Sequence, residues 1–192
     1  MILRRFAAPL ILLASASPAF AHTGHGASSF MQGLAHPLGG LDHVLAMIAI
    51  GLYAAMIGGR ALWLVPAAFL GAMALGGTLG TIGYGLPYTE VGIAISVIVL
   101  GLAIALRVSI PTAGAMTLAG VFAIVHGHAH GTEMPQSVSG YEYAAGFLLA
   151  TAALHGAGIA LGIILEKTRW RLVQAAGGAM ALAGLMLLAS AV

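Results

Sequence analysis

Six apolar stretches, each close to the length needed to cross a bilayer, dominate the sequence. They cover roughly residues 37–58, 61–83, 89–107, 111–130, 141–166 and 170–191, and short turns join them. About 20 apolar residues form a helix that spans the hydrocarbon core of a membrane. Only 6% of the residues are charged, whereas a soluble domain carries about 25%. The sequence therefore predicts an all-α membrane protein, with a six-transmembrane-helix bundle over residues 37–192 and the lipid bilayer as its solvent.

Residues 1–21 have the form of a signal peptide. Two arginines, at positions 4 and 5, precede an apolar core, and Ala19-Phe20-Ala21 has the small-x-small pattern of a cleavage site. Cleavage after Ala21 would leave a short external tail, residues 22–36, which contains His22 and His25. An uncleaved first helix is the alternative. Both interpretations place the following residues outside the cytoplasm.

The remaining basic residues predict the orientation of the bundle. When six spans are threaded from an external N-terminus, all of these residues fall on the cytoplasmic side: Arg60, Arg107, Lys167, Arg169 and Arg171. This distribution obeys the positive-inside rule. It also places both mature termini on the external side, together with most of the histidines.

The start of the first span carries three side chains that can bind a metal: His36, Asp42 and His43. If the helix begins near Pro37, the seven-residue spacing puts both imidazoles on nearly the same face, about 10 Å apart along the axis. Ionisable groups at the mouth of a membrane span often mark an ion or substrate path. We therefore predict a metal-binding role for all three, with a simple polar helix cap as the alternative.

A second cluster closes the fourth span. His126 and His130 are one helical turn apart, and Glu133 continues the same face. Two imidazoles in this arrangement can bind one divalent metal, with the carboxylate as third ligand or as orienting group. His128 faces the other side, and we rank it with His22 and His25 as an accessory capture residue. A solvated histidine-rich loop is the alternative interpretation.

His155 lies near the middle of the fifth span. A lone polar side chain in a membrane helix can serve only as an interhelical hydrogen-bond partner. Because four other histidines already indicate a path from outside, we predict that His155 lies deeper along the same path. Gly156 is expected to let another helix approach at this level. The pairs Gly76/Gly80 and Gly158/Gly162 are expected to permit tight helix packing.

The ligand chemistry restricts the metal only broadly. The chain has no cysteine, so thiolate ligands and disulfides are excluded. Imidazole and carboxylate ligands suit Ni(II), Co(II), Zn(II) or Cu(II), and affinity order alone does not favour nickel. The same residues could also hold zinc in an intramembrane hydrolase, or pairs of histidines could ligate haem in a cytochrome.

Two motifs closely resemble those of the HupE/UreJ family of bacterial nickel permeases. They are His36-x5-Asp42-His43 followed by Ala46-Met47, and His126-Gly127-x-Ala129-His130-Gly131-x-Glu133-x-Pro135. The resemblance covers essentially the whole mature chain. It carries over His36, Asp42, His43, His126, His130 and Glu133 as metal-binding residues, with Met47 as a pathway candidate.

The resemblance implies a function as well as a site. It implies secondary or passive transport of nickel, with cobalt as a second candidate, across the bacterial inner membrane for hydrogenase or urease maturation. Nickel is then the transported substrate, no cofactor is permanently bound and the protein is not an enzyme. The sequence has no Gly-rich phosphate-binding loop, which argues against a self-contained ATP-driven pump. The sequence indicates neither an ATPase subunit nor a nucleic-acid partner, and it does not determine the oligomeric state.

Overall fold

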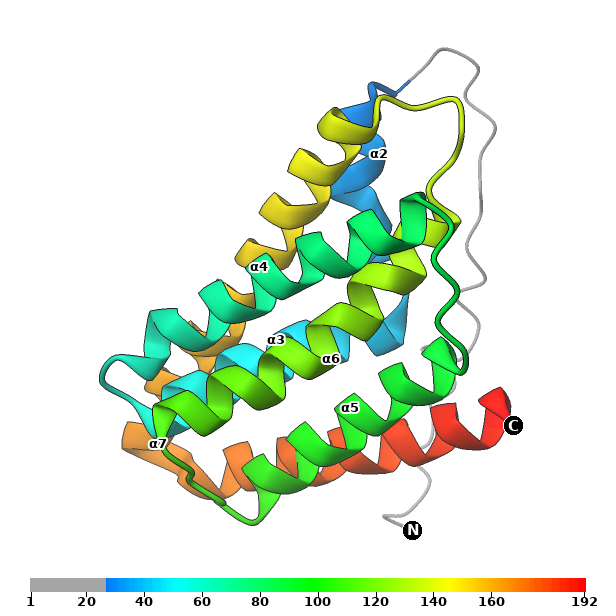
Figure 1. Ribbon diagram of the computed structural model, residues 1–192. Coiled ribbons are helices and arrows are strands. Elements are labelled where there is room, and N and C mark those ends of the chain that lie inside the picture. The colour runs from blue at the N-terminus through cyan, green and yellow to red at the C-terminus, as the bar shows by residue number, and fades with distance from the viewer. Residues whose placement is uncertain (1–26) are drawn as a thin grey trace, which may run out of the picture.

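The computed structural model describes residues 27–192, and every regular element within that range is a helix (Figure 1). The predicted all-α class is confirmed. The predicted signal peptide, His22 and His25 lie outside the described residues. In chain order the elements are α2 (Ser29–Ala35), the 3-10 helix η1 (His36–Leu38), α3 (Leu41–Ile57), α4 (Ala61–Thr81), α5 (Thr89–Ala105), α6 (Thr112–Glu133) and α7 (Gly140–Ala191).

Several of these helices are long and apolar enough to cross a membrane. Among the described residues, three segments meet both conditions: Ala61–Thr81, Gly140–Leu165 and Arg169–Ala191. A fourth is added if the bent pair Ser29–Leu38 and Leu41–Ile57 forms one broken span. Helix α5 is apolar but has only 17 residues, and α6 carries three histidines along its 22 residues. The chain is therefore a multi-pass membrane protein.

The first predicted span begins later than the sequence suggested. We expected a continuous helix from about Pro37, but Pro37 lies in η1 and α3 begins only at Leu41. The two helical pieces are bent by 81° relative to each other. The bend falls at Gly39-Gly40, where Gly40 has an extended backbone. Because glycine is a poor helix former, breaking the helix at this dipeptide costs less free energy than breaking it at the neighbouring residues.

Helix α7 contains both of the last two predicted spans. Its backbone leaves the helical region at Arg169, with φ −148° and ψ 55°. In Figure 1 the first half runs down from the top of the molecule, and the second half, orange to red, turns back beneath the other helices. The break lies between the predicted stretches 141–166 and 170–191, so the sequence located this turn correctly.

Glycines set the closest helix contacts. A Cβ at Gly76 would overlap the Ile124 carbonyl oxygen, and a Cβ at Gly127 would overlap that of Met73, so α4 and α6 touch backbone to backbone. Gly158 packs in the same way against Ile48 of α3. The expected tight packing at these glycine pairs is confirmed. The expectation for Gly156 is wrong, because no neighbouring atom lies within 4 Å of a Cβ at that position.

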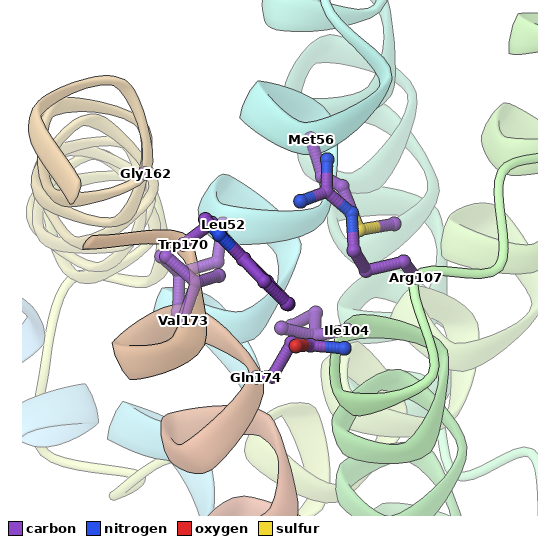
Figure 2. Close-up of a pocket in the computed structure, with 8 residues that line it drawn as sticks. All are labelled: Leu52, Met56, Ile104, Arg107, Gly162, Trp170, Val173 and Gln174. Atoms are coloured by element: carbon purple, nitrogen blue, oxygen red, sulfur yellow. The ribbon is translucent and has the colours of Figure 1, made fainter. Parts of the chain in front are cut away.

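One end of the bundle is basic. The turns after α3 and α5 and the break in α7 all lie at the lower left of Figure 1. The guanidinium carbon of Arg107 lies 5.8 Å from the ring centre of Trp170, and that of Arg171 lies 5.5 Å from the same ring. Figure 2 shows Trp170 with Leu52 and Met56 of α3 around a cavity of only about 10 Å³. That volume is at the lower limit for one water molecule.

Candidate metal site

At the opposite end of the bundle, three side chains from two distant parts of the sequence meet. His36 of η1 and His130 and Glu133 of α6 each offer one ligand atom, and these atoms lie within 4.8 Å of one another. The His36 Nε2 atom is 2.9 Å from His130 Nδ1 and 3.4 Å from Glu133 Oε2. We call this group the outer triad. Its carboxylate side chain is 52% exposed and His130 only 5%, so the triad spans the boundary between surface and interior.

Close packing of α2 on α7 brings His36 to this place. A Cβ at Gly33 would overlap the Tyr143 carbonyl oxygen, and a Cβ at Gly146 would overlap that of Phe30. Figure 1 shows α2 lying against the first half of α7. The 81° bend after η1 then lets α3 continue into the bundle. The bend is therefore what separates His36 from α3 and turns it toward α6.

Asp42 and His43 form a second polar pair directly behind the triad. The His43 Nδ1–H donates to Asp42 Oδ1 over 2.8 Å, because a carboxylate can only accept. This assigns the lone pair to His43 Nε2, which has no hydrogen-bond partner among the described residues. A Cβ at Gly40 would lie 2.5 Å from His43 Nδ1 and 2.6 Å from Asp42 Oδ1. Glycine at position 40 therefore leaves room for the pair as well as for the bend.

The imidazoles continue inward in ring-to-ring contact as far as His126, and Phe69 connects His126 to His155. The ring centre of His130 is 4.9 Å from that of His36 and 4.3 Å from that of His43. The His43 ring is in turn 5.6 Å from the ring of His126, which is fully buried. Finally, Phe69 of α4 lies 5.9 Å from His126 and 5.0 Å from His155. A line of five histidines thus leads from the half-buried His36 to His155 in the core.

The structure divides the predicted α6 cluster between two levels. We expected His126, His130 and Glu133 to share one site, but Glu133 meets His130 and His36 instead. The reason is depth, since seven residues of α-helix separate His126 from Glu133 by about 10 Å. The His126 Nδ1–H donates to the Phe122 carbonyl, and its Nε2 has no partner within residues 27–192.

Two other predicted residues remain: His128 lies away from this line, and Met47 lies one turn after His43 on α3. His128 is buried on the other side of α6, where its Nε2–H donates to the Tyr84 carbonyl. Met47 is fully buried in the hydrophobic core around α3. For both, a role in metal capture or passage stays a prediction.

Sequence reasoning missed the aromatic walls of the site. Phe147 of α7 lies 4.3 Å from the His130 ring and 6.0 Å from the His36 ring. Tyr143, one turn earlier, lies 5.8 Å from the His36 ring, and Phe69 contacts the rings of both His126 and His155. The four-residue spacing of Tyr143 and Phe147 in a helix rich in Ala and Gly was the available signal.

A cavity of about 410 Å³ adjoins the triad. It lies between α4, α6 and the first half of α7, and His130, Tyr143 and Phe147 form part of its wall. Neutral imidazoles with one carboxylate can bind a divalent cation of borderline softness. Unpartnered ring nitrogens that follow one another inward can bind such a cation at successive positions.

Comparisons with known proteins agree with the motifs. The family model described as HupE / UreJ protein matches residues 10–187. A relative, Protein HupE of Rhizobium leguminosarum bv. viciae, is 47% identical over 180 residues, which make up 93% of this chain and 94% of the relative. No solved structure matches the chain.

Proposed function

Because the chain belongs to the HupE/UreJ family, we propose that it is a permease that carries nickel, with cobalt as a second candidate, into the bacterial cytoplasm. The family is associated with nickel and cobalt transport for hydrogenase or urease. The family match gives no support to the alternative of an intramembrane hydrolase. The observation that carries the proposal is the line of histidines from His36 to His155.

In this proposal the outer triad captures the ion. Its carboxylate is exposed enough to attract a hydrated cation, and His36 and His130 supply two imidazole nitrogens next to it. A transporter must also release what it binds, so an open three-ligand group suits it better than a closed four-ligand cage. From the triad the ion passes to His43, whose ring is the nearest neighbour of His130 on the inward side.

In the Asp42–His43 pair, the aspartate prepares His43 to bind the ion in this second step. Hydrogen bonding of one ring nitrogen to a carboxylate fixes the tautomer and makes the other nitrogen a better ligand. Here the acceptor is Asp42 Oδ1, so the His43 Nε2 lone pair stays available to the ion. Asp42 also brings a negative charge into a partly buried place, which lowers the cost of moving a divalent ion there.

The directions of the packed helices support six spans. The residue numbers of contacting pairs rise together in α4 and α6, and also in α3 and the first half of α7, so the helices of each pair run parallel. In α5 and the second half of α7 one number rises as the other falls, so these two run antiparallel. The contacts are Gly76–Ile124 and Gly80–His128 for α4 and α6, Gly51–Gly158 and Ala55–Gly162 for α3 and α7, and Ile98–Gly184 and Gly101–Ala181 for α5 and α7. If six spans cross the membrane in alternating directions, spans 2 and 4 (α4 and α6) must be parallel, and so must spans 1 and 5 (α3 and the first half of α7). Spans 3 and 6 (α5 and the second half of α7) must be antiparallel. Under the positive-inside rule, the basic end then faces the cytoplasm and the outer triad faces the periplasm.

Metal accumulation in cells tests the proposed function. Cells that express the full chain should accumulate nickel well above cells with an empty vector, and zinc and copper should show no such increase. Cobalt accumulation, measured in parallel, tells whether the second candidate is also carried. Equal nickel content in the two strains, at confirmed membrane expression, would refute the proposal.

A further inference from the structure

One face of α7 leads from the outer triad into the core. Tyr143, Phe147, Thr151 and His155 follow one another at four-residue intervals, and all four are buried. Residues at this spacing lie on one side of a helix, about 6 Å apart along the axis. Tyr143 and Phe147 contact the rings of the triad. Thr151 and His155 therefore lie about 6 and 12 Å deeper than Phe147 along the axis.

The two deeper residues carry polar atoms that the protein does not use. Thr151 Oγ1 and both ring nitrogens of His155 are buried and have no hydrogen-bond partner among residues 27–192. Buried polar groups are nearly always paired. Other hydroxyls in these helices donate to a carbonyl three or four residues earlier: those of Thr78, Thr81, Ser96, Thr117, Thr132 and Ser190. Thr151 departs from this pattern.

His126 adds a third donor from helix α6, next to the same phenylalanine ring that contacts His155. Its Nδ1–H donates to the Phe122 carbonyl, so the Nε2 lone pair is free of protons, and that atom has no partner in the described part of the chain. The His126 and His155 rings both stand against the ring of Phe69, at 5.9 and 5.0 Å. Their exposed fractions are 0% and 1%, so neither ring is in contact with bulk water.

We propose that His155 and Thr151 of α7, with His126 of α6, form an inner station that binds the transported divalent cation within the bundle. The inference rests on the proposed function and deepens it, because it assigns the ion a second position below the outer triad. Two imidazoles and a hydroxyl form a neutral donor set for a borderline metal. Without a carboxylate of its own, this station holds the ion less tightly than the triad, which favours its onward release.

A purely structural histidine is the competing explanation. A histidine that joins two helices does so through a hydrogen bond, and His155 makes none with the described residues. Its own carbonyl, rather than its ring, is what packs against Gly51 of α3. The ring is thus left with two nitrogens for a partner that the chain itself does not supply.

Counting bound ions tests the inner station directly. Nickel binding by the detergent-solubilised full chain should fall by one ion per molecule in His155→Leu, a change that keeps the volume and leaves no buried polar atom. Thr151→Val should weaken binding of that ion about fivefold, and Thr151→Ser should restore it. Ser96→Ala is the matched control, because this buried hydroxyl already donates to the Ile93 carbonyl, and its binding should equal that of the wild type.

Uptake kinetics separate the inner station from the outer triad. His155→Leu should lower the maximal rate of nickel uptake and leave the half-saturating concentration unchanged, since the triad is intact. Absence of uptake in wild-type cells would refute the proposed function, while the ion count would still decide the inner station. The inner station would be overturned if His155→Leu and Thr151→Val both bound as many nickel ions as the wild type, with the same affinity. An equal loss of binding in Ser96→Ala would overturn it too.

Discussion

At the scale of single residues, His128 and His130 show how position on a helix decides the role of a side chain. They are two residues apart in α6 and both are buried. The His130 ring contacts the rings of His36 and His43, whereas His128 donates to the Tyr84 carbonyl on the other side of the helix. The sequence predicted this difference in direction from the 100° rotation per residue. It could not identify the neighbours, because these come from η1, α3 and the α4–α5 turn.

This pair gives a matched test of the triad. We expect His130→Ala to reduce nickel uptake by about tenfold or more, because the triad and the step to His43 both lose their ligand. His128→Ala should retain uptake within about twofold, as only an accessory capture residue and its hydrogen bond to a turn are lost. Initial rates of nickel uptake, normalised to the amount of protein in the membrane, provide the comparison. Equal losses in the two variants would mean that α6 is merely disturbed.

Asp42 is expected to act through His43. In Asp42→Asn the amide can donate as well as accept, so the His43 tautomer is no longer fixed and the negative charge is lost. Loss of a hydrogen bond that orients a metal-binding histidine costs about 10- to 100-fold in metal affinity, and we expect the half-saturating nickel concentration to rise accordingly. Glu142→Gln, at an exposed carboxylate near the start of α7, is the control. A wild-type concentration dependence in Asp42→Asn would contradict this role.

At the scale of helices, the sequence predicted where the long helices lie along the chain but not where the first one bends. Hydropathy located all the long helices and the break near Arg169, because burial in lipid requires uninterrupted apolar stretches. It did not predict the 81° bend at Gly39-Gly40. Pro37 is compatible with either the start of α3 or a separate 3-10 helix. Packing of α2 on α7 through Gly33 and Gly146 selects the second arrangement, and such tertiary contacts are not readable from local sequence.

The α4–α6 contact can be tested through its glycines. In Gly127→Ala the new methyl would overlap the Met73 carbonyl oxygen, so the helices must separate and shift the neighbouring His126 and His130. We expect a lower melting temperature of the solubilised protein and reduced uptake. Gly156→Ala meets no atom within 4 Å and should melt at or slightly above the wild-type temperature, because alanine is the better helix former. Equal melting temperatures in the two variants would show that the close contact is unimportant.

At the scale of the whole molecule, the two ends of the bundle differ in chemistry. One end gathers the outer triad, the Asp42–His43 pair and a cavity of about 140 Å³ lined by Asp42 and Glu90. The other gathers Arg107 and Arg171 around Trp170, beside a cavity of only about 10 Å³. A cation that enters at the first end thus meets carboxylates and imidazoles early and a basic surface last.

The absence of cysteine allows a clean test of orientation. Gln136→Cys lies in the exposed loop between α6 and α7, and Ser109→Cys lies in the exposed turn between α5 and α6. With an outward-facing triad, a membrane-impermeant maleimide applied to the periplasmic face should label Gln136→Cys and leave Ser109→Cys unlabelled until the inner membrane is disrupted. The reverse pattern would invert the orientation. Labelling of both in intact membranes would contradict a fixed six-span arrangement.

Nickel flux into sealed vesicles tests most directly whether the histidine line is a transport path. Purified full-length chain would be reconstituted into liposomes that contain a metal-sensitive fluorophore and no nucleotide, beside protein-free and His130→Ala vesicles. We expect saturable nickel influx with the wild-type chain and a rate near that of protein-free vesicles with His130→Ala. Wild-type vesicles no faster than protein-free ones, or His130→Ala vesicles as fast as the wild type, would contradict transport through this line of residues.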